Sequence, residues 1–160
     1  MKRMPQGRRC FLVAAILLAA AGDATAQEKP TAYTPGLGDL MTMTVQPRHA
    51  KLGLAAREGN GPYAAYEQHE SEEAFERAAR IWPKWRTYSI SEMMISVTKE
   101  PIKALDEAIK AGDPSRFAAA YEQLTAACNT CHRSAERGVI VIQAPAASAF
   151  PDQDFRPVKE

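Results

Sequence analysis

Apolar side chains recur every three or four residues over most of the chain, which is the spacing of one face of an α-helix. The clearest run lies between Asp113, a good N-cap followed by proline, and Gly138, a good C-terminal stop. Its members are Phe117, Tyr121, Leu124, Cys128, Cys131 and Ala135, at steps of 4, 3, 4, 3 and 4. The pattern predicts a helix whose cysteines point toward other helices.

Two more helices are predicted earlier in the chain. The first covers about Gly36 to Asn60, and Pro47 is expected to kink it or split it into two pieces. The second has Pro62 in its first turn and runs to about Trp82.

A third helical region opens at Ser89, which stands three residues before Glu92 as in a capping box. Pro101 is expected to make it restart, and Gly112 to end it. Strand signals are missing apart from the alternating VIVIQ near the end. The predicted fold is therefore all-α, an antiparallel four-helix bundle in which the first and last helices run in opposite directions, followed by an irregular C-terminal tail.

Residues 1–26 have the pattern of a cleaved secretory signal, with basic residues, an apolar run and small residues before the cleavage point. The organisation predicted is a signal over 1–26, a helical domain over 27–138 and a tail over 139–160 that packs on the bundle. The apolar run is too short to span a bilayer with ease, and no other stretch is apolar enough. Removing 1–26 takes away four basic side chains and one acidic one, which turns the net charge of +1 into −2. This balance argues against a nucleic-acid partner.

Candidate chemistry lies in CNTCH, which spans Cys128 to His132. Cys10 falls in the predicted signal, so the exported chain keeps only the two cysteines of this motif. A covalently attached haem needs two thiols for its two vinyl groups and an imidazole that reaches the iron, and C-x-x-C-H supplies all three. Export agrees with this interpretation, because bacteria attach c-type haem outside the cytoplasm. The sequence therefore predicts one covalent haem c.

Other interpretations of the motif fit less well. A zinc site needs two further cysteine or histidine ligands, and His49 and His69 are isolated from each other. A thiol redox pair belongs at a helix N-terminus, whereas this pair comes late in its helix, where the dipole has the opposite sign. A disulfide between residues three apart closes almost no loop and would stabilise little.

A signal, four helices and C-x-x-C-H in the last helix resemble the class II c-type cytochromes, the cytochrome c prime group. The resemblance covers about Gly36 to Gly138 and implies thioether bonds at Cys128 and Cys131, with His132 as the proximal iron ligand. The tail after Gly138 and the proline in the first helix depart from the family pattern, which indicates a distinct subfamily. Relatives often pair through helices, so a homodimer is one expected state.

The distal iron ligand stays open at this stage. In an antiparallel bundle the end of the last helix lies beside the start of the first helix. A haem held near the end of the last helix is therefore expected near Leu40 to Val45. Met41 is the first candidate, and Met43 and His49 are the alternatives, each weighed against ordinary core packing. Arg48 and Leu52 match an Arg-x-x-x-Leu spacing of the family's distal helix, which implies a five-coordinate iron instead.

The function predicted from these features is one-electron transfer between periplasmic redox proteins, by a haem carrier that is not an enzyme. The alternative is a five-coordinate haem protein that binds small gases such as NO or CO. A thioether ligand on the iron favours the first function, and an open distal face favours the second.

Overall fold

The computed structural model describes residues 33–159, which are all-helical apart from loops and an extended tail. The predicted signal over 1–26 lies outside the described residues. Within 33–159 there is no strand, only an isolated bridge between Trp85 and Tyr88 in the loop before α4. None of the helices in this range combines the length and apolarity needed to cross a bilayer.

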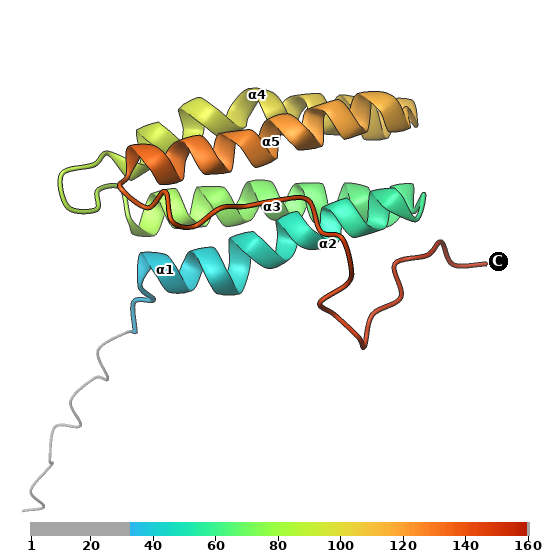
Figure 1. The fold of residues 1–160 in the computed structure, drawn as a ribbon, viewed down its shortest axis with the longest axis horizontal. Helices are drawn as coiled ribbons and strands as arrows, with labels where there is room; N and C mark the ends of the chain where they lie inside the picture. Colours follow the sequence, from blue (N-terminus) through green and yellow to red (C-terminus); the bar gives the residue numbers. More distant parts are fainter. Residues whose placement is uncertain (1–32, 160) are drawn as a thin grey trace, which may run out of the picture. The chain divides into compact units, whose positions relative to one another are not determined.

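Four helical runs pack side by side along their length (Figure 1). The first consists of three joined pieces: α1 (Leu37–Leu40), a π-helical turn called η1 (Met41–Val45) and α2 (Gln46–Arg57). The others are α3 (Gly61–Ile81), α4 (Ile90–Ala111) and α5 (Pro114–Ser134). These four runs agree with the helices predicted from the apolar spacing.

Pro47 has a subtler effect than the expected kink or split. It is the second residue of α2 and has no N–H to donate to the preceding turn. The turn ahead of it is widened into η1, in which the Gln46 N–H donates to the Met41 carbonyl, five residues back. The first helix therefore continues through this point, but its register changes by one residue.

Two predicted features of α4 are wrong. The helix does not restart at Pro101 but runs unbroken through it, because Thr98 and Ile102 on either side are buried against neighbouring helices. The Thr98 hydroxyl also donates to the Met94 carbonyl at 2.8 Å in the same region. Ser89 is the N-cap residue, as expected, but its side chain makes no capping hydrogen bond.

The start of α5 is as predicted, whereas its end comes earlier. Asp113 Oδ1 accepts from the N–H groups of Ser115 and Arg116, both at 3.0 Å. The helix ends at Ser134 rather than Gly138, because Glu136 takes the left-handed conformation (φ 57°). The Arg137 N–H then donates to the His132 carbonyl at 2.7 Å, which closes a Schellman motif without glycine.

The extended tail after α5 lies against the helices and is held at several places. Arg57 donates to the carbonyls of Pro145 and Ala146 at 3.2 and 3.0 Å. Phe155 is buried and stacks on Tyr63 of α3 with ring centres 5.5 Å apart. These contacts join the tail to α2 and α3.

A close contact between α2 and α5 depends on a glycine. A Cβ atom on Gly53 would lie 2.6 Å from Tyr121 Oη and 2.7 Å from Tyr121 Cζ. We expect Gly53→Ala to lower the free energy of unfolding by roughly 1–3 kcal/mol, because the buried Tyr121 ring has to shift. Urea denaturation of the purified protein measures this loss.

The matched control for this prediction is the same substitution in a Tyr121→Ala background. There the clash is absent, so Gly53→Ala should cost much less than in the parent protein. Equal costs in the two backgrounds would show that the Tyr121 contact is not the reason for glycine at this position.

Candidate functional site

The CNTCH side chains line a cavity between the first helical run and the end of α5. No Cα atom of Leu37–Val45 comes within 8 Å of a Cα atom of α5, so the two helices diverge here. The cavity that fills this gap has a volume of about 260 Å³ and is bordered by Cys128, Cys131 and His132. The structure thus brings the three motif residues together on one wall of a cavity.

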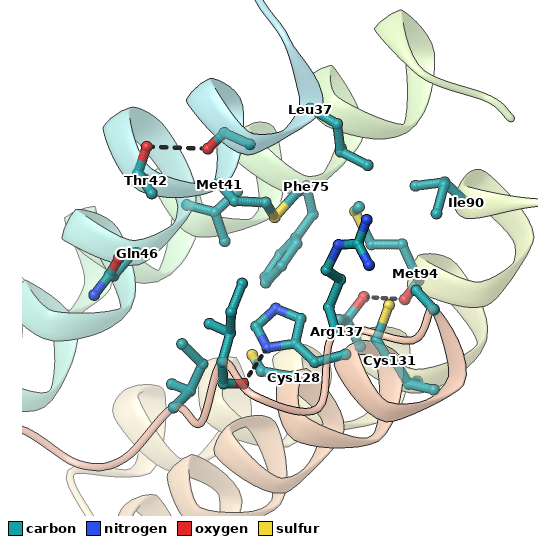
Figure 2. A pocket seen from close by; sticks show the side chains of 18 of the residues that line it. Leu37, Met41, Thr42, Gln46, Phe75, Ile90, Met94, Cys128, Cys131 and Arg137 are labelled. Atoms are coloured by element: carbon teal, nitrogen blue, oxygen red, sulfur yellow. Dashed lines mark hydrogen bonds between the residues drawn. The ribbon is translucent and has the colours of Figure 1, made fainter. Parts of the chain in front are cut away.

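The remaining walls are mainly apolar and come from every helical run and from the tail. Figure 2 shows Met41 and Phe75 across the cavity from Cys128, while Met94 of α4 lines another part of the wall. The other apolar lining residues are Leu37, Val45, Trp85, Ile90, Val97, Ala135, Ile140 and Ile142. Such a lining suits a large, flat, mostly apolar group that needs few polar contacts.

His132 is held by a hydrogen bond from one side of its ring. Its Nδ1 lies 2.8 Å from the carbonyl oxygen of Ile140, which can only accept, so Nδ1 carries the proton and donates. The lone pair of a neutral imidazole is then on Nε2. Metal-binding histidines commonly make this type of hydrogen bond through the nitrogen that does not bind the metal.

The two cysteines are free thiols in a partly buried setting. Burial is the main reason that the pKa of Cys128 rises to about 11, and burial also raises the pKa of Cys131. Because thiol–disulfide exchange needs the thiolate, this environment does not favour a redox pair. No group of three or more His, Cys, Asp or Glu side chains that could hold a metal ion by themselves occurs within residues 33–159.

The structure separates the three distal candidates. Met41 lines the cavity, whereas Met43 is 74% exposed and does not. His49 borders the cavity but is only 4% exposed, and both of its ring nitrogens face hydroxyl groups of α5. Of the three, Met41 is the one whose side chain is free to meet a group in the cavity.

The hydrogen bonds of His49 account for its position. Thr125 Oγ1 donates to the Tyr121 carbonyl at 2.9 Å and accepts from His49 Nε2, also at 2.9 Å. The Tyr121 hydroxyl lies 2.9 Å from the His49 carbonyl and 3.2 Å from Nδ1, to both of which it can donate. The two rings also stack at 4.7 Å. In this arrangement a neutral imidazole donates from Nε2 to Thr125, and the single Tyr121 hydroxyl proton is shared between the His49 carbonyl and Nδ1.

Arg48 and Leu52 do not border the cavity. Arg48 forms ion pairs with Glu67 at 3.2 Å and Glu70 at 3.0 Å, both on α3. Leu52 is fully buried in the hydrophobic core. Their family-like spacing therefore reflects packing between α2 and α3 in this chain.

Several lining residues were not predicted as part of the site. Met94 is buried in the hydrophobic core and also borders the cavity (Figure 2). Arg137 also reaches the cavity and lies over the Trp85 ring, with Cζ 4.6 Å from its centre. Ile140 and Ile142 come from the tail, and their alternation with the exposed Val139 and Val141 was the available signal.

The chain matches no protein-family model, no curated protein and no solved structure. The residues present nevertheless fit a covalent haem. Two thiols and one imidazole with a free Nε2 share a wall, and the opposite wall is apolar with a thioether at Met41.

The buried imidazole of His49 should make the free energy of unfolding depend on pH. Burial lowers its pKa from 6.5 to about 4, so the folded protein binds this proton less readily than the unfolded chain. The contribution is complete above pH 6.5 and is lost as the pH falls from there toward 4. We expect His49 alone to lower the free energy of unfolding by about 2 kcal/mol between pH 7 and pH 5.

Chemical denaturation at a series of pH values measures this dependence. His49→Gln should remove that part of the slope, whereas His69→Gln should keep it, because His69 is an exposed α3 side chain beside Glu73. An unchanged slope in His49→Gln would contradict the assignment.

Proposed function

We propose that this chain is a c-type cytochrome with one covalent haem, and that its task is one-electron transfer. The observation that carries the proposal is the shared cavity wall of Cys128, Cys131 and His132, with His132 already oriented through Nδ1. An antiparallel four-helix bundle, as in the class II c-type cytochromes, is the architecture we propose for the helices. The protein would then be a carrier rather than an enzyme.

Each residue of the site has a defined part in this proposal. When bound, the haem supplies an iron that alternates between ferric and ferrous. Cys128 and Cys131 would hold it through thioethers, and His132 Nε2 would face the iron. The apolar walls keep water away, which favours the less charged form of the iron and so raises its reduction potential.

We infer that Met41 is the distal ligand. Its support is the exposure of Met43 and the complete hydrogen bonding of His49, which leave Met41 as the one candidate free to turn toward the iron. Met41 also begins η1, and π-helical turns are frequent at functional sites. A thioether ligand gives the six-coordinate iron that electron transfer favours.

Gas binding is the second candidate function. It is favoured by the apolar character of the cavity wall around Phe75, Val45 and Leu37, which would admit NO or CO but gives little support to a charged ligand. In that case Met41 would only pack in the wall and the iron would stay five-coordinate.

Location and partners follow from the same proposal. Attachment of haem c requires export, so we propose a periplasmic protein whose signal over 1–26 is removed. Its partners would be periplasmic redox proteins. A homodimer, as in the relatives that the sequence resembles, is the oligomeric state to test by sedimentation.

The first experiment is expression of the full chain in a bacterium that carries the haem-attachment machinery. The purified protein should have the mass of the processed polypeptide plus one haem, and Cys128→Ser with Cys131→Ser should abolish attachment. A product with the bare polypeptide mass and two reactive thiols would refute the proposed function.

The second experiment replaces the candidate distal ligand. Met41→Leu should convert the ferric protein from a low-spin to a high-spin spectrum, because the apolar leucine has no sulfur to donate. Met43→Leu and Met94→Leu are the matched controls and should keep the low-spin spectrum. A parent protein that is already high-spin and responds to CO or NO would instead favour gas binding.

A further inference from the structure

The chain returns across the site directly after α5. The left-handed Glu136 reverses its direction, and residues 139–142, here called the strap, then run back along the helix end. Val139 and Val141 are 93% and 73% exposed, whereas Ile140, which is 50% exposed, and Ile142 line the cavity. The strap is therefore part of the cavity wall on the side of His132.

Asn129 fixes the strap to α5 through a double hydrogen bond. Its Oδ1 accepts from the Ile142 N–H at 2.7 Å, and its Nδ2 donates to the Ile142 carbonyl at 2.8 Å. Nδ2 also donates to the Thr125 carbonyl at 3.1 Å, which restrains the amide on the helix side. One side chain thus satisfies both backbone groups of Ile142.

This double hydrogen bond between Asn129 and Ile142, here called the clamp, lies close to the hydrogen bond on His132. Ile142 is two residues beyond Ile140, whose carbonyl accepts from His132 Nδ1 at 2.8 Å. Asn129 and His132 are three residues apart on α5, so they are neighbours on the helix surface. The same short segment is therefore held at one end by Asn129 and contacts the imidazole at the other.

We propose that Asn129 is a positioning residue for the proximal ligand. It holds the strap so that the Ile140 carbonyl accepts a hydrogen bond from His132 Nδ1, which fixes the ring with Nε2 toward the iron. This inference rests on the proposed function. The hydrogen bond makes the imidazole a more basic ligand and so stabilises the ferric state.

The direction of the effect follows from this chemistry. Without the clamp, the Ile140 carbonyl withdraws, the imidazole becomes less basic and the ferric state loses stability relative to the ferrous state. The reduction potential therefore rises. A strap that served only to close the apolar wall would admit water when released, and the potential would then fall or stay where it was.

The test compares two variants of the haem-loaded full chain. Asn129→Ala should change the ratio of oxidised to reduced protein at a fixed potential by roughly tenfold, which corresponds to a rise of ~59 mV for a one-electron couple. Arg57→Ala is the control, because it removes two hydrogen bonds farther along the tail, at Pro145 and Ala146. It should leave the potential unchanged.

A second measurement does not depend on any variant being stable. In the parent protein the His132 ring N–H should exchange with solvent much more slowly than the ring N–H of the exposed His69, as NMR can measure. Fast exchange at His132, or an Asn129→Ala potential equal to that of the parent, would overturn the inference. Failure of the parent chain to attach haem would instead overturn the proposed function.

Discussion

The contact between His49 and Tyr121 determines where the site can form. Here Tyr121 donates to His49, and His49 Nε2 donates to Thr125 of α5. The His49 and Tyr121 rings also stack, and Gly53 gives Tyr121 the room that it needs. Before this point along the first helical run, Leu37–Val45 stay away from α5. The cavity occupies the space beyond the contact, so the pairing of a buried neutral histidine with a tyrosine hydroxyl supports both the fold and the gap.

Apolar spacing was sufficient to predict the four helical runs, because each buries one face against its neighbours. The predicted helix ends and breaks were wrong where the backbone conformation differs from the one that the residue type usually favours. The stop of α5 was placed two residues too late, at Gly138, because Glu136 rather than a glycine takes the left-handed conformation. The break at Pro101 was expected from the missing N–H alone, while burial on both sides keeps α4 continuous.

The motif led to the residues on one wall of the cavity but could not identify the opposite wall. A spacing rule cannot separate Met41 from Met43 when the π-helical turn η1 shifts the register between them. Spacing also gives no sign that Met94, which is buried in the core, borders the cavity as well, since a cavity-lining side chain and a core side chain share the same helix face. Arg48 shows the reverse error, in which a family-like spacing serves an ion pair with α3.

Composition alone could not show that the tail lines the cavity. The tail reaches the cavity only because α5 ends abruptly and the chain turns back. A helix that continued to Gly138 would carry Arg137 and Gly138 onward, away from the His132 ring. The Schellman turn instead directs the next residues back, so that one backbone carbonyl reaches Nδ1 and two isoleucines close the wall. Burial also raises the pKa of both thiols on the same wall, which disfavours free-thiol chemistry there. The end of one helix thus connects the backbone geometry, the hydrogen bond on the His132 ring and the apolar lining of the cavity.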